Sequence, residues 1–208
     1  MDPLFAATRD MLIFGQPYNE IVEGIKRGVK RPDIRENYLE VLPLLRDYFA
    51  GIRPRFVNSV SRRYYPVGRG LMVPFDPPLI YGDGERIYFP WLSFWRSYPI
   101  DRERLSLFVT MVQELLDQDP DLDQSKFLIL DFSASKPQYP RALRVIDAAD
   151  VPRLSEKHKD EMLAVFAEGY WLAVAELKRK VQTSRTSGDE DRPEAGDPTL
   201  FDPDLNKQ

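Results

Sequence analysis

The chain has 208 residues, of which 43% are hydrophobic and 12% aromatic, enough for one core of ordinary size. It contains no cysteine and a single histidine, His158, which excludes disulfides, thiolate metal sites, cysteine nucleophiles and sites built from several histidines. The formal net charge is −4, but eleven basic and four acidic residues lie between Lys26 and Arg69, so this stretch carries +7 and the rest −11. Such a distribution predicts one positive region on an acidic body.

Two helices are predicted ahead of residue 55. The first lies in residues 17–30, where the apolar side chains fall on one side. The second begins at Asp33, which can cap it, and its apolar residues recur at steps of three and four: Ile34, Tyr38, Val41, Leu42, Leu45 and Phe49. Pro43 lies inside this pattern and is expected to kink or divide the helix, because it lacks the backbone N–H of its turn.

Residues 56–95 change character to β-branched and aromatic side chains between glycines and prolines, which favours a sheet. Four strands are predicted, near residues 56–66, 71–75, 79–82 and 85–91. The pair Asp83-Gly84 predicts a tight hairpin turn between the last two. Five prolines in this region confine the strands to edges, bulges or short lengths.

A further helix is predicted from Asp101, its N-cap, to the residues before Pro120. The uninterrupted apolar run 127–130 then predicts a strand in the middle of the sheet, with residues 141–147 as its neighbour. A last helix, from residue 155 to about 180, is expected to complete the core with one stripe of side chains: Leu163, Phe166, Tyr170, Val174 and Leu177.

These elements predict an α+β fold, a single domain in which helices pack a mixed sheet with a central hairpin. The predicted parts are an N-terminal helical segment (1–30), the α+β core domain (31–180) and a disordered acidic tail (181–208). Leu200 and Phe201 are the main apolar residues of the tail and form a predicted docking motif for a partner. Alternatively, the acidic tail folds back over the positive region.

The first residues carry acidic side chains and only a short apolar run, 11–14, so no secretory signal is expected. No stretch approaches the roughly 20 uncharged apolar residues that cross a bilayer. We therefore expect a cytoplasmic protein that is not bound to a membrane.

The segment RPRFVNSVSRRYYPVGRG, residues 53–70, holds five arginines and no acidic residue. Arginines interleaved with aromatic residues can pair with phosphates and stack on bases together. The predicted nucleic-acid-binding residues are Arg53, Arg55, Arg62, Arg63, Tyr64, Tyr65, Arg69, Trp95 and Arg96. Because side chains alternate along a strand, only one face of residues 62–65 can contact a ligand. Two alternatives stay open: ion pairs with the acidic body, and an arginine-rich protein interface.

The predicted order of helix, three strands, helix and strand, over roughly residues 33–132, resembles the core of the restriction-endonuclease-like nucleases. That family carries one acid on a strand and, on the next strand, a triplet made of Glu or Asp, any residue and Lys. The two carboxylates hold a divalent metal, and the lysine steadies the attacking water. The corresponding acids are Asp76, Asp83 and Glu85, but Arg86 and Ile87 follow Glu85 where the family has its lysine. Asp131 and Lys136 show a related spacing on a later strand.

We expect a non-catalytic accessory factor that binds nucleic acid or another polyanion through the arginine and aromatic residues and a protein partner through its tail. No cofactor or metal is expected, because no nucleotide-binding or hydrolase motif occurs. The alternatives are a protein–protein interaction subunit of a larger complex and a metal-dependent nuclease with a degenerate site. The sequence does not specify DNA or RNA, the partner or the oligomeric state.

Overall fold

The computed structural model describes residues 3–77, 79–95, 100–136 and 138–186, which fall in two compact units. The first unit is Met1–Ala164 and the second is Val165–Gln208. The boundary lies inside the last helix. The first unit holds the sheet, and the described residues of the second all belong to one helix.

The described helices and strands confirm an α+β fold. The helices are α1 (Pro3–Ile13), α2 (Tyr18–Gly28), α3 (Pro32–Phe49), α4 (Arg102–Asp117) and α5 (Glu156–Thr186), with a short 3-10 turn η1 (Ala148–Asp150). The strands are β1 (Phe56–Asn58), β2 (Arg63–Gly68), β3 (Leu71–Phe75), β4 (Ile80–Asp83), β5 (Arg86–Ser93), β6 (Lys126–Asp131) and β7 (Arg144–Asp147).

The main sheet has the order β1-β4-β5-β6-β7 and is mixed. Strands β1, β4 and β5 are antiparallel neighbours, β6 runs parallel to β5, and β7 is antiparallel to β6. The parallel pair requires a crossover, which α4 provides. The predicted strand near 56–66 is two strands in different sheets, since β2 pairs with β3 in a separate hairpin.

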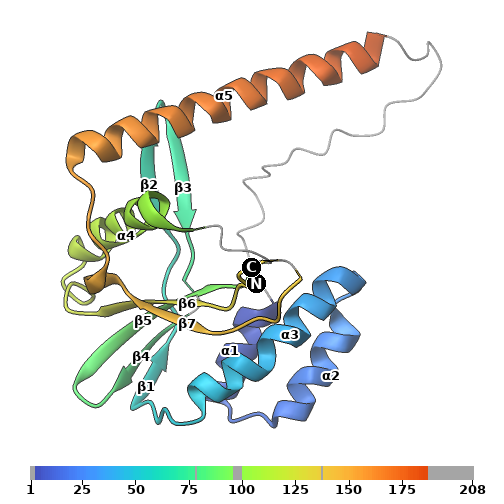
Figure 1. Ribbon diagram of the computed structural model, residues 1–208, viewed down its shortest axis with the longest axis vertical. Helices are drawn as coiled ribbons and strands as arrows, with labels where there is room; N and C mark the ends of the chain where they lie inside the picture. The colour runs from blue at the N-terminus through green and yellow to red at the C-terminus, as the bar shows by residue number, and fades with distance from the viewer. Residues whose placement is uncertain (1–2, 78, 96–99, 137, 187–208) are drawn as a thin grey trace. The chain divides into compact units, whose positions relative to one another are not determined.

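Helices α1, α2 and α3 cover one face of the main sheet (Figure 1). Their buried side chains meet those of β4, β5 and β6 in one cluster, which includes Leu4, Ile25, Leu42, Leu45, Tyr81, Leu92 and Leu130. Helix α3 runs through Pro43 without division. Helix α1 was not anticipated from the sequence, because its apolar residues show a weak helical pattern.

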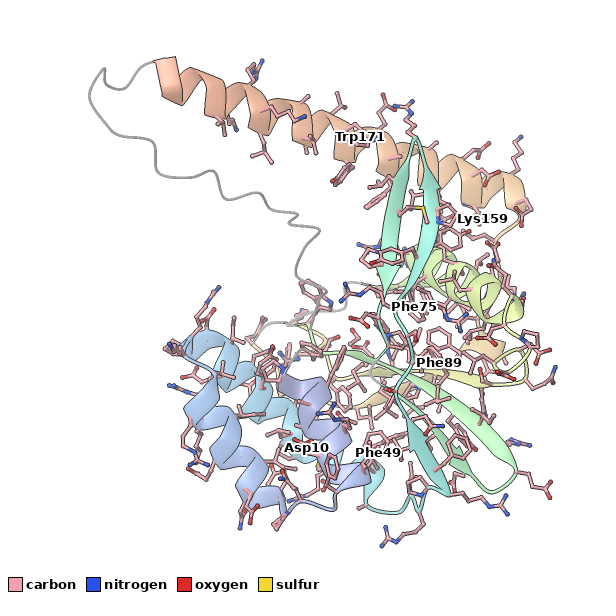
Figure 2. The ribbon with its side chains drawn as sticks, turned by 180° about the vertical axis from the view of Figure 1, so that it is seen from behind. Asp10, Phe49, Phe75, Phe89, Lys159 and Trp171 are labelled. Carbon is pink, nitrogen blue, oxygen red and sulfur yellow. The ribbon has the colours of Figure 1, made fainter. Side chains whose placement is uncertain are left out.

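The other face of the sheet carries an aromatic cluster that joins the β2–β3 hairpin to α4. The ring of Phe75 on β3 stacks on that of Phe89 on β5, with 5.8 Å between the ring centroids. Both residues are labelled in Figure 2. Phe108 of α4 meets Phe127 of β6 at 6.0 Å. Ring contacts of this kind add about 0.5–1.5 kcal/mol each to the burial of the apolar area.

Helix α5 spans the boundary between the two units, with part of the predicted stripe on each side. Leu163, in the first unit, is buried, but Phe166 is 52% and Leu177 62% exposed. The described part of the second unit is this helix alone, so no second element of that unit covers the stripe. The prediction that the stripe completes the core therefore stays a prediction beyond residue 164.

The core of the first unit predicts a clear difference between two substitutions. Leu130→Ala should lower the free energy of unfolding by about 2–5 kcal/mol, because Leu130 is fully buried between the helices and the sheet. Val145→Ala, on a side chain that is 48% exposed on β7, should change it by less than about 0.5 kcal/mol. Urea unfolding followed by circular dichroism checks both, and equal losses would contradict this placement of the core.

Candidate interaction surfaces

The two arginines at the start of the hairpin are paired with carboxylates. The Nη2 atom of Arg62 lies 2.8 Å from Oδ2 of Asp76. Arg63 donates to Asp119 and to the carbonyl oxygen of Leu115 at the C-terminal end of α4. The hydrogen bond from Arg63 is the largest cause that lowers the pKa of Asp119. Arg63 therefore attaches the hairpin to α4, and its charge is matched there.

Arg53 and Arg55 lie on a different part of the first unit. Arg53 donates from Nη1 to the carbonyl oxygens of Ala50, at 3.0 Å, and Ile52, at 3.2 Å, which follow α3. Arg55 donates from Nη1 to the carbonyl oxygen of Gly84 in the β4–β5 turn, at 2.8 Å. These two guanidinium groups fasten the chain after α3 to a turn of the main sheet.

Arg69 occupies the tip of the β2–β3 hairpin. It has φ +50° and lies between Gly68 (φ +112°) and Gly70 (φ +74°), a turn that requires residues able to adopt positive φ. The Arg69 side chain is exposed, and no hydrogen bond or ion pair joins it to another residue in the described part of the chain. Nearby on the same hairpin, Tyr64 is 51% and Met72 48% exposed.

Tyr65 is held inside a polar network. Its hydroxyl donates to Glu114 of α4, and Nζ of Lys159 donates to the same carboxylate at 2.7 Å and to Glu156 at 2.8 Å. Lys159, labelled in Figure 2, is 6% exposed. The network joins β2, α4 and the first turn of α5. Lys159 was missed in the sequence because lysine is usually solvated, although its position four residues before Leu163 places it on the buried side of the helix.

The network raises the pKa values of Tyr65 and Lys159, so both side chains hold their protons more tightly than usual. Burial, and then the hydrogen bond to Glu114, raise the pKa of Tyr65 to about 12. Burial alone would lower the pKa of Lys159, but hydrogen bonds to Glu114 and Glu156 outweigh it, and that pKa lies above its usual range.

Trp95 is exposed but lies among acidic side chains. It is 65% exposed and lines a pocket of about 480 Å³ with Asp33, Ile34, Glu36, Asn37, Tyr38 and Phe94. The backbone oxygen of Trp95 accepts a hydrogen bond from Arg141, whose side chain is almost fully buried. Carboxylates beside an indole suit a cationic group, so this pocket does not extend the predicted polyanion surface.

The predicted nucleic-acid surface is thus divided. The structure gathers Arg62, Arg63, Tyr64, Tyr65 and Arg69 on one hairpin, where Arg62 and Arg63 are paired and Tyr65 is buried. Arg53 and Arg55 lie in the loop between α3 and β1, and Trp95 follows the end of β5. Arg96, Leu200 and Phe201 lie outside the described residues.

Among the acids of the nuclease resemblance, Asp76 and Asp131 hold contacts within the fold, and Asp83 and Glu85 lie at a turn. Asp76 pairs with Arg62, while Asp83 and Glu85 flank Gly84 in the β4–β5 turn. Asp131 is 3% exposed and accepts hydrogen bonds from the backbone of Ser133 and, at 2.8 Å, from Arg144. Within residues 3–77, 79–95, 100–136 and 138–186, no group of three acidic, histidine or cysteine side chains could hold a metal ion.

The second unit exposes the largest apolar side chains of α5. They are Val165 (72%), Phe166 (52%), Tyr170 (36%), Trp171 (41%), Leu172 (65%), Leu177 (62%) and Val181 (51%). We call these seven residues the α5 apolar face; Phe166, Tyr170, Leu177 and Val181 point to one side of the helix, and Val165, Trp171 and Leu172 to the other. Three basic residues, Lys178, Arg179 and Lys180, lie near its C-terminal end. The sequence could not reveal this exposure, since a stripe at helical spacing is also typical of a core helix.

Comparison with known proteins returned no matching family model, no matching curated protein and no matching solved structure. Among the described helices, none has both the length and the apolar character needed to cross a membrane.

The Tyr65–Glu114–Lys159 network predicts a loss of stability at alkaline pH. Tyr65 and Lys159 hold their protons more tightly in the folded chain than in the unfolded one, so their contribution is complete below about pH 10 and is lost as the pH rises through the folded values. Tyr65→Phe should flatten this loss between pH 10 and 12.

Urea unfolding at a series of pH values measures the effect. Tyr64→Phe is the matched control, because Tyr64 is exposed on the neighbouring position of β2. If both variants keep the wild-type pH dependence, the network does not couple protonation to folding.

Proposed function

We propose that this chain is a protein-interaction subunit that binds its partner through the α5 apolar face. The observation that supports the proposal is the exposure of seven large apolar residues within the 17 positions from Val165 to Val181. Burial of apolar area is worth roughly 25 cal/mol per Å², so a helix of this kind is stabilised by a protein surface that covers it.

The residue types also suit a protein interface. Phe166, Tyr170 and Trp171 are three aromatic residues within six positions, and Tyr and Trp are enriched among the residues that dominate binding energy. The basic residues Lys178 and Arg179 follow the aromatic ones and would lie at the polar rim of such an interface.

Two aromatic substitutions test this proposal. Trp171→Ala should weaken binding of the partner by roughly 30-fold or more, since truncation of a central aromatic residue costs about 2 kcal/mol. Phe14→Ala removes an aromatic side chain that is 65% exposed in the first unit and should leave binding unchanged. The partner is identified by affinity purification of the full chain, and affinities are then measured by titration with the purified partner.

Equal affinities for the two variants would contradict the assignment of the face. Circular dichroism of both variants controls for loss of helix.

A second function, nucleic-acid binding, is supported by the hairpin tip. Arg69 is exposed between two glycines of positive φ, with Tyr64 exposed on the same hairpin. An arginine at the end of a two-stranded ribbon suits insertion beside a phosphate backbone. Arg62 and Arg63, by contrast, would have to leave their carboxylates to contribute.

Anisotropy of a labelled single-stranded oligonucleotide across a salt series measures this activity. Binding should weaken steeply with salt, and Arg69→Ala should reduce the salt slope by about one. Arg104→Ala, on α4, is the control for general loss of positive charge. Binding that is absent at low salt, or that does not depend on Arg69, rejects the hairpin as a nucleic-acid site.

A further inference from the structure

We infer that a pocket in the first unit binds a small organic monoanion, a molecule with a short apolar body and one carboxylate. The pocket has a volume of about 310 Å³. It is lined by the last turn of α1, the first residue of α2, the last turn of α3 and the loop that follows α3. These lining residues all belong to the first unit, so the inference goes beyond the proposed function.

One part of the lining is apolar and is held in place by the core. Met11 and Leu12 of α1, Phe49 of α3 and Ile52 of the following loop belong to this part. Phe49, labelled in Figure 2, is buried in the core cluster, and the other three side chains pack against that cluster. The volume lies at the lower end of the range for small-molecule pockets, roughly 300–1,000 Å³. The pocket therefore suits a short aliphatic chain or a small aromatic ring system.

Two arginines, Arg46 and Arg53, form the charged part of the lining, and Arg46 is already paired. Its Nη2 atom lies 2.7 Å from Oδ1 of Asp47, and its guanidinium carbon lies 4.7 Å from the centroid of the Tyr18 ring. These contacts fix the position of Arg46 and match its charge. None of the described residues that line the pocket is acidic.

Arg53 supplies the pocket with a charge that no carboxylate matches in the part of the chain that the structure describes. Its Nη1 atom donates to the carbonyl oxygens of Ala50, at 3.0 Å, and Ile52, at 3.2 Å. These bonds orient the guanidinium group and leave its Nε and Nη2 donors for another acceptor. A carboxylate can accept two parallel hydrogen bonds from two such donors, which makes this the preferred partner of an arginine.

The balance of charges at the pocket favours an anion that carries a single charge. Asp47 offsets Arg46, so Arg53 contributes the remaining positive charge. The C-terminal end of α3 carries roughly half an elementary negative charge at the same place, which reduces this surplus without cancelling it. A group with several negative charges, such as a nucleotide phosphate, has too few positive partners here, whereas one carboxylate is matched.

Titration of the full chain with octanoate, followed by isothermal calorimetry, tests the inference. Octanoate should bind one site with a Kd on the order of 0.1–1 mM, the strength expected of a ligand with so few atoms. Hexanoate should bind roughly tenfold more weakly, because each buried methylene is worth up to about fourfold. Octanamide, which has the same body without the charge, should also lose at least tenfold.

Two arginine variants locate the site. Arg53→Gln should weaken octanoate binding at least tenfold, because it removes a charge-assisted hydrogen bond. Arg55→Gln is the matched control: Arg55 is also exposed and donates through Nη1 to a carbonyl oxygen, but it is not among the residues that line the pocket. It should change the affinity by less than twofold. Both side chains are exposed, so both variants should keep the fold, as circular dichroism can verify.

The methionine methyl signals give a second, independent readout. During the titration the methyl resonance of Met11, assigned with Met11→Leu, should shift, and that of Met72 on the β2–β3 hairpin should not. Equal losses in Arg53→Gln and Arg55→Gln, or octanamide binding as tightly as octanoate, overturn the inference. Absence of octanoate binding does so too, including the case in which another part of the full chain fills the pocket.

Discussion

The carboxylate of Glu114 is the contact on which the arrangement of the first unit depends. It accepts hydrogen bonds from Tyr65 of β2 and Lys159 of α5, so one side chain of α4 ties together three elements that are distant in sequence. The aromatic cluster around Phe75 adds an apolar attachment of the same hairpin. The Glu114 hydrogen bonds and the aromatic cluster hold one face of the β2–β3 hairpin. The exposed residues of the hairpin therefore lie on its other face and at its tip.

Local patterns in the sequence were sufficient for several elements. The three- and four-residue spacing in α3, the capped start of α4 and the apolar run of β6 predict these elements close to their observed bounds. The separation of β1 from β2 could not be predicted, since it is decided by pairing partners: β1 meets β4, whereas β2 meets β3. The residues of one strand do not indicate with which other strand, or in which sheet, that strand pairs.

The candidate site was harder to predict from the sequence, because it too depends on contacts between distant parts of the chain. Composition located the arginines of residues 53–70, but their roles depend on oxygens far away in the chain, such as Asp119 for Arg63 and Gly84 for Arg55. Part of the excess positive charge of this stretch is therefore used in contacts within the fold. Exposure of the α5 apolar face was equally hidden, because the spacing of Phe166 and Leu177 is compatible with either a core or a surface.

The ends of the main sheet have a consequence for how the chain can associate. The outermost strands are β1, of three residues, and β7, of four, and β7 begins and ends with the charged residues Arg144 and Asp147. Short edge strands with charged residues expose few unpaired backbone groups. They therefore disfavour pairing with a strand of another molecule and the growth of fibrils. The edges of the main sheet therefore direct any association away from backbone pairing.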